Sequence, residues 1–281
     1  MNLNSYSLII YSGYRNPSSL RGSKEVSQMS AILDLHPALL VGFSGIVFIL
    51  TSTVISDLRR AWGEDEPLSE AERLTLYDLI RLRLALMAVI AIAAWALAGL
   101  PLAQMGLHWG SGWRFIAAWG VTGTALTLMA IQTAFALRSH EARRETARQL
   151  NADENLNVIR PATRREISSF TWLGLTAGIT EEIIFRGFLT VLFALVAPLW
   201  AAIILANAFF VFIHIYQGWK GMLRIVPITV LMAFVAWLGG SLYPAITLHI
   251  GVDWIAAFMF RAVANVPPEG EPRQEEAAAS A

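Results

Sequence analysis

Long apolar runs constrain this chain more than any other feature of its sequence. A helix rises 1.5 Å per residue, so about 20 apolar residues cross the ~30 Å hydrocarbon core of a bilayer. The composition agrees, because 56% of the residues are hydrophobic and 15% are charged, which is too apolar for a soluble domain. We therefore predict an all-α, polytopic transmembrane helix bundle of about seven to eight spans, with room for re-entrant or interfacial helices. Seven spans are placed at about residues 37–56, 84–102, 113–137, 178–197, 199–216, 222–238 and 242–262.

Arginine and lysine gather in alternate loops, which predicts the orientation. Basic residues follow the first, third, fifth and seventh spans, whereas the other loops carry almost none. Cytoplasmic loops are enriched in such residues. Seven crossings with the N-terminus outside and the C-terminus in the cytoplasm place every basic loop on the cytoplasmic side. We expect a multi-pass protein of the plasma (inner) membrane of a bacterium.

Three segments between the spans allow finer predictions. Ser69 and Glu72 form a capping-box pattern that opens a short amphipathic helix, which we expect at the membrane surface before the second span. The charged stretch 138–165 reads as a solvated loop. Residues 168–200 would make one helix of about 48 Å, so it tilts, or breaks near Gly187, or begins outside the core. We favour a crossing at 178–197, with the first turns among the headgroups.

These patterns divide the chain into four parts. Residues 1–35 form a disordered N-terminal segment, within which Met29 is an alternative start. Residues 36–165 hold the first transmembrane helices and basic cytoplasmic loops. Residues 166–263 form the membrane core that carries the unusual polar residues, and residues 264–281 form a disordered tail.

Charged and ionisable residues interrupt the last spans. An ionised side chain near the centre of a bilayer costs at least about 2.5–3.5 kcal/mol, so such groups are paired, hydrated or used. Glu182 and Arg186 are four residues apart and can pair along one helix face, which leaves Glu181 turned about 100° away towards a partner helix. There it could serve as a general base. The other positions are His214, His249 and Asp253.

Several readings of these residues remain open at this point. Each cluster alone could be a structural ion pair, a packing histidine or a proton relay in a transporter. Glu, His and Asp from three helices together are the residues that activate water or hold a metal. The chain has no Cys, which excludes a thiol nucleophile and thiolate metal ligands, and its net charge of zero gives no reason to expect nucleic acid binding.

The same residues resemble the motifs of the CPBP family, the CAAX prenyl protease 2 and bacteriocin-processing (Abi) intramembrane proteases. Glu-Glu-x-x-x-Arg is matched by Glu181, Glu182 and Arg186, and Phe-x-x-x-His by Phe210 and His214. The third motif, His followed four residues later by Asn or Asp, is matched at positions 249 and 253. The resemblance covers about residues 166–262.

The resemblance implies an endopeptidase that acts on a membrane-associated peptide or lipidated protein, either prenylated and CAAX-type or bacteriocin-like. It implies that Glu181 and His214 activate water, that His249 and residue 253 stabilise the oxyanion, and that Glu182 and Arg186 hold Glu181. Asp253 differs from an Asn at this position in its chemistry. A carboxylate, unlike an amide, donates no hydrogen bond to an oxyanion unless it is protonated. A divalent metal such as zinc, held by Glu181, His214, His249 and Asp253, is therefore an open alternative.

The expected partners are thus membrane lipids and a peptide substrate, without nucleic acid. Two other functions remain open: a non-catalytic membrane scaffold or immunity protein, and a proton-coupled transporter. A transporter would be expected to show inverted repeats with broken helices, which the sequence does not display.

Overall fold

The computed structural model describes residues 35–61, 68–152, 158–264 and 266, and this part of the chain contains helices and turns but no strand. The predicted all-α bundle is confirmed. The predicted disordered ends, 1–35 and 264–281, lie outside the described residues except for Leu35, Ala264 and Val266. The elements are α3 (Pro37–Ala61), α4 (Glu70–Leu97), η1 (Leu102–Met105), α5 (Gly112–Ala136), α6 (His140–Asn151), α7 (Arg164–Glu181), η3 (Glu182–Leu189), α8 (Thr190–Ala194), α9 (Leu199–Ile213), η4 (Ile215–Gln217), α10 (Gly218–Gly239) and α11 (Tyr243–Val263).

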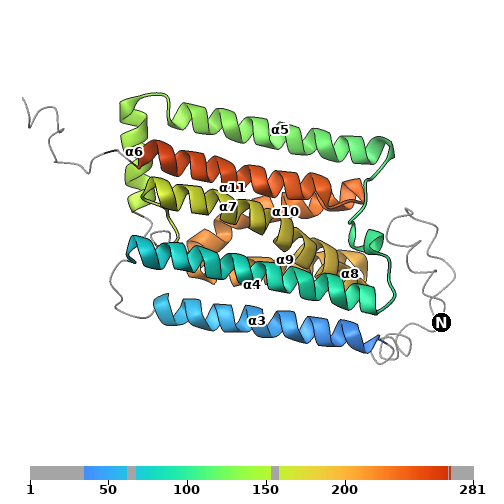
Figure 1. The fold of residues 1–281 in the computed structure, drawn as a ribbon. Coiled ribbons are helices and arrows are strands. Elements are labelled where there is room, and N and C mark those ends of the chain that lie inside the picture. The colour runs from blue at the N-terminus through green and yellow to red at the C-terminus, as the bar shows by residue number, and fades with distance from the viewer. Residues whose placement is uncertain (1–34, 62–67, 153–157, 265, 267–281) are drawn as a thin grey trace, which may run out of the picture.

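The long helices form two layers. In Figure 1, α3, α4, α7, α11 and α5 lie side by side, and each contacts the next in this order. Behind them, α9 and α10 contact each other, and α10 also packs on α5 and α11. The α7 helix is therefore central, because it lies between α4 and α11.

Five of the described helices are long and apolar enough to cross a membrane. They match the first, second, third, sixth and seventh predicted spans: Pro37–Ser56, Glu70–Leu97, Gly112–Ala136, Ile215–Gly239 and Tyr243–Val263. The fifth predicted span corresponds to the shorter apolar helix α9. The fourth corresponds to α7, η3 and α8, which follow one another without a break and contain the charged motif.

The prediction of a separate, short surface helix before the second span was wrong. Ser69 accepts a hydrogen bond from the backbone of Glu72, so the predicted capping box is present, but the helix that it opens runs on through the span to Leu97. A buried face, which includes Leu76, Tyr77 and Leu84, continues through the residues assigned to a separate element. With no Gly or Pro to interrupt it, one 28-residue helix forms.

The stretch 138–165 is not only a solvated loop, because it contains α6. Ser139 caps this helix by accepting a hydrogen bond from the backbone of Ala142. On its exposed surface, Glu145 accepts hydrogen bonds from Arg148 and Gln149, and these bonds hold the pKa of Glu145 below its usual value. Charge alone thus predicted exposure correctly but missed the helix.

The fourth predicted span is helical throughout, with a change of winding within it, and the expected place of its first turns among the headgroups stays a prediction. The helix starts at Arg164, where Thr163 and Glu166 form a capping box, and its winding changes at Glu182 rather than at Gly187. From Glu182 to Leu189 it is a π-helix, and the axis turns between α7 and α8 (Figure 1). The helix then ends at Ala194, shortly before Pro198.

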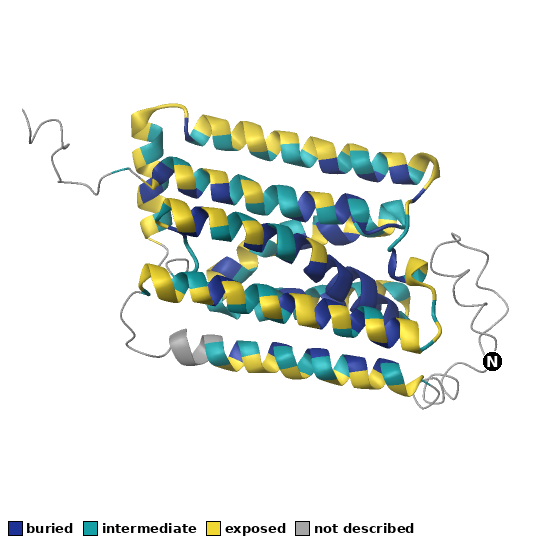
Figure 2. Cartoon of the chain, in the orientation of Figure 1, coloured by how far each residue is buried: buried dark blue, intermediate teal, exposed yellow. Residues whose placement is uncertain are grey.

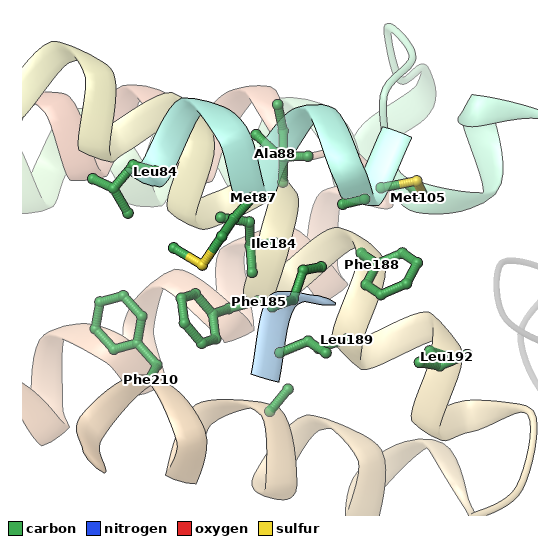
Figure 3. Packing of buried hydrophobic residues seen from close by; sticks show 14 of the residues in the cluster. Leu84, Met87, Ala88, Met105, Ile184, Phe185, Phe188, Leu189, Leu192 and Phe210 are labelled. Atoms are coloured by element: carbon green, nitrogen blue, oxygen red, sulfur yellow. The ribbon is translucent and has the colours of Figure 1, made fainter. Parts of the chain in front are cut away.

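The main hydrophobic core surrounds this π-helical segment. Every residue of η3 is buried, and in Figure 2 the deepest colour is concentrated there. Figure 3 shows Phe185, Phe188 and Leu189 of η3 among side chains of α4, η1 and α9. Two ring pairs fix the rotation of the segment: Phe188 packs edge-on to Trp95 of α4, and Phe185 packs edge-on to Phe210 of α9.

Candidate active site

The charged motif sits where the helix changes from α to π winding. Glu181 is the last residue of α7, and Glu182 and Arg186 belong to η3. The Thr190 hydroxyl donates to the carbonyl oxygen of Phe185 at 2.8 Å, which gives this buried carbonyl a partner. π-helical turns inside α-helices occur frequently at functional sites.

Glu182 joins Arg186 to His249. One oxygen of Glu182, Oε1, lies 3.0 Å from Nη1 of Arg186 and 2.9 Å from Nδ1 of His249. A carboxylate only accepts hydrogen bonds, so the Nδ1 atom of His249 carries the proton in this contact. The predicted pair of Glu182 and Arg186 is present, and Glu182, which is fully buried, also orients the imidazole of α11.

Glu181 and Asp253 flank the other nitrogen of the same imidazole. The Nε2 atom of His249 is 3.7 Å from Oε2 of Glu181 and 3.9 Å from Oδ2 of Asp253. These distances are too long for direct hydrogen bonds but suit a bridging group of the size of water. Oε2 of Glu181 is buried and makes no hydrogen bond within the described part of the chain. Two carboxylate oxygens thus lie within 4 Å of one imidazole nitrogen.

Two glycines allow α11 to approach α7 closely enough for these contacts. A Cβ atom on Gly174 would lie 2.7 Å from Cβ of Asp253, and one on Gly178 would lie 2.9 Å from the backbone nitrogen of Ile250. Both are closer than side chains tolerate. The Gly-x-x-x-Gly spacing, which puts both glycines on one helix face, is typical of closely packed membrane helices.

Two residues that the motifs did not identify hold the guanidinium of Arg186. Nη2 donates to Oδ1 of Asn207 at 3.3 Å, to the Thr229 carbonyl at 3.3 Å, and to the Thr229 hydroxyl. The guanidinium also lies over the ring of Phe210, 4.2 Å from its centre. Asn207 was noticeable as an amide in an apolar run. Thr229 was not, because a threonine in a membrane helix usually bonds to its own helix backbone.

His214 stands apart from the glutamates. It is the C-cap residue that follows α9, and its Nδ1 atom donates a hydrogen bond to the Phe210 carbonyl at 2.8 Å. The Phe210 ring packs on both imidazoles, 4.7 Å from His214 and 6.0 Å from His249 between centres. Among the described residues His214 makes no hydrogen bond or ion pair with Glu181 or Glu182, so the structure brings five of the six predicted site residues together directly and the sixth through an aromatic ring.

The suggested metal ligands do not form a metal site in this arrangement. Within the described residues, no group of three or more His, Asp and Glu side chains is placed to hold a metal ion. Nδ1 of His249 is engaged by Glu182, and Nδ1 of His214 by a backbone carbonyl. Dependence on zinc or another divalent ion therefore stays a prediction.

Comparison with known proteins places this site in a family. Residues 163–255 match the model of type II CAAX prenyl endopeptidase Rce1-like proteins. Comparison with curated proteins and with solved structures gave no match. The matched segment begins at the cap of α7, ends within α11, and contains every residue of the site described above. Residues 163–255 are therefore similar to the Rce1-like family, as the three motifs indicated.

Proposed function

We propose that this protein is an intramembrane endopeptidase that hydrolyses a peptide bond of a membrane-associated substrate with activated water. The observation that carries the proposal is that Glu181 and Asp253 both lie within 4 Å of Nε2 of His249, beside the Glu182–Arg186 pair. The family model supports a peptide hydrolase of the CAAX type in general.

In the proposed reaction Glu181 is the general base. A water held between its carboxylate and Nε2 of His249 would lose a proton to Glu181, and the resulting hydroxide would attack the carbonyl carbon of the scissile peptide bond. The carbon–nitrogen bond then breaks, and Glu181 returns the proton to the leaving amine. The free Oε2 atom of Glu181 favours this role, because it has no competing hydrogen bond in the described chain.

His249 would position the water and stabilise the charge that develops on the carbonyl oxygen. Its ring is fixed by the 2.9 Å contact with Glu182, so Nε2 points towards Glu181 before any substrate binds. When Nε2 also carries a proton, it can donate to an oxyanion. Asp253 would help to hold the same nitrogen rather than act as an oxyanion donor, since a carboxylate lacks the amide hydrogens of an Asn.

His214 has a less direct role in this proposal than the resemblance implied. Its Nδ1 atom is committed to a carbonyl, so the neutral ring accepts through Nε2, and Phe210 lies against both histidines. In this proposal His214 lines the site, and its imidazole can relay a proton.

The family match and the apolar surroundings support a proposal for the substrate class. We propose a peptide or lipidated protein that reaches the site from the membrane, with a prenylated C-terminal segment as the first to test. The distribution of basic residues supports an orientation with the N-terminus outside and the C-terminus in the cytoplasm of a plasma (inner) membrane.

The test is cleavage of membrane-associated peptides by the purified protein in liposomes, with mass spectrometry of the products. The substrates are paired peptides with and without a prenyl group. The variants are Glu181→Gln, His249→Ala and His214→Ala, with His140→Ala on the surface helix α6 as the matched control. Each is assayed with and without a metal chelator.

We expect Glu181→Gln and His249→Ala to lose at least about 100-fold in kcat/KM, as removal of a general base or its partner does. His214→Ala should lose less, and His140→Ala nothing. Wild-type cleavage by Glu181→Gln would refute the proposed base. A folded wild type that cuts no peptide would favour a scaffold or immunity role, and loss of cleavage with the chelator would show that a metal takes part.

A further inference from the structure

The polar network of the site does not end at Arg186 but continues into α9 and α10. Nη1 of Arg186 faces Glu182, whereas Nη2 faces away from it, towards Asn207 of α9 and Thr229 of α10. The Thr229 hydroxyl donates onward to Oδ1 of Asn207 at 3.1 Å. The contacts thus form one path from α10 through η3 to His249 on α11.

The groups along this path are buried, except for the half-buried Asn207. The side chains of Arg186 and Glu182 are 3% and 0% exposed, and Thr229 is 1% exposed. In such surroundings burying an arginine without partners costs free energy of folding, and a hydrogen bond is stronger than in water. Arg186 therefore keeps the position in which both Nη1 and Nη2 have acceptors, and Asn207 and Thr229 define that position on the Nη2 side.

The geometry points to Thr229 and Asn207 as positioning residues for the site. They hold the guanidinium of Arg186, Arg186 holds Glu182, and Glu182 holds the imidazole of His249 in the rotation that directs Nε2 to Glu181. Neither residue touches the reacting atoms. The kinetic part of this inference rests on the proposed function, whereas its structural part, the fixed rotation of His249, does not.

The chain offers a close pair of variants and a matched control. Thr229→Val keeps the shape of the side chain and removes the hydroxyl, and Thr229→Ser restores the hydroxyl. Asn207→Leu removes the same anchor from the other helix, as an independent variant. The control is Thr122→Val, because Thr122 on α5 is equally buried at 1% exposure and donates to a backbone carbonyl, that of Pro244, outside this network.

Two measurements are made on every variant. The first is kcat and KM for peptide cleavage in liposomes. The second is the rate at which diethyl pyrocarbonate modifies His249, followed by mass spectrometry of the peptide that contains it. This reagent attacks an unprotonated imidazole nitrogen, so the rate reports how firmly the ring is held, whether or not the protein cleaves anything. The unfolding midpoint in detergent confirms that each variant is folded.

We expect Thr229→Val and Asn207→Leu to lower kcat about 10-fold with little change in KM, since the reacting groups are misplaced while the substrate surface is intact. His249 should be modified several-fold faster in both variants, and Thr229→Ser and Thr122→Val should behave like the wild type.

Unchanged modification of His249 in folded Thr229→Val and Asn207→Leu would overturn the inference. Equal effects in Thr229→Ser and Thr229→Val would also overturn it, because the hydroxyl would then not matter. If the wild type cleaves no peptide but His249 becomes more reactive in the two variants, the positioning role holds and the proposed function fails.

Discussion

Replacing Gly178 by alanine tests the close contact on which the site depends. The added Cβ would lie 2.5 Å from Cγ1 of Ile250 and 2.9 Å from its backbone nitrogen. Ordinary van der Waals contact begins near 3.4 Å. A side chain can rotate away, but the backbone nitrogen belongs to α11, so the two helices must separate by about half an ångström.

The size of the effect follows from that displacement. Overpacking of this kind costs about 1–3 kcal/mol of stability. His249 precedes Ile250 on α11, so the same movement carries its Nε2 atom away from Glu181, from which it is 3.7 Å distant. A misplacement of up to about 1 Å can cost 100-fold in rate. We therefore expect Gly178→Ala to lower kcat/KM by about 10-fold to 100-fold and to lower the unfolding midpoint.

The assay combines peptide cleavage in liposomes with thermal unfolding in detergent. Gly123→Ala is the matched control, because Gly123 lies within helix α5 and an added Cβ there meets no atom within 4 Å. It should unfold at the same temperature as the wild type or higher, since alanine favours helix over glycine. A Gly178→Ala variant with wild-type cleavage and an unchanged midpoint would refute the reasoning, because α7 and α11 could then not be as close as described.

Three further predictions concern other parts of the molecule. Arg73→Leu leaves the fully buried Glu166 without its cation, 2.8 Å away, and should cost about 3 kcal/mol in detergent unfolding. Arg148→Leu, which breaks an exposed pair with Glu145, should lower the unfolding midpoint much less. Because its bonds to Arg148 and Gln149 lower the pKa of Glu145, the stabilisation that they give α6 should be lost as pH falls through the range in which Glu145 takes up a proton. Amide exchange of α6 would show this, and Glu145→Gln should abolish the pH dependence. The chain has no native Cys. An impermeant thiol reagent should therefore label Trp109→Cys from the outer side of the membrane and Glu145→Cys from the cytoplasmic side. Labelling of both from one side, or the reverse pattern, would contradict the proposed orientation.

Hydropathy and motif spacing predicted the architecture well because both depend on local sequence. The bilayer demands apolar runs of a fixed length, and these runs mark the helices. The spacing of Glu182 and Arg186 likewise predicted their contact, since residues four apart share a helix face. The capping box at Ser69 was predicted for the same reason, although the length of its helix was not.

Other features depend on contacts between distant residues. The π winding at Glu182 was not predicted, because no single residue of η3 requires it and the packing of Phe185 and Phe188 accompanies it. Thr229 was missed because its role comes from an arginine 43 residues away in sequence. The resemblance paired Glu181 with His214, yet the histidine beside Glu181 is His249. The glycines of α7 allow this, because they let α11 approach closely.

The π-helical segment also has a consequence for sequence alignment. A π turn accommodates a residue more than the α turn that it replaces, because its hydrogen bonds run from i to i+5. A relative that keeps α winding through this segment should therefore be one residue shorter between Glu181 and Pro198 and should align with a single gap there. Without that gap, every position of η3 and α8 beyond the change in winding would be compared with a residue from a different face of the helix.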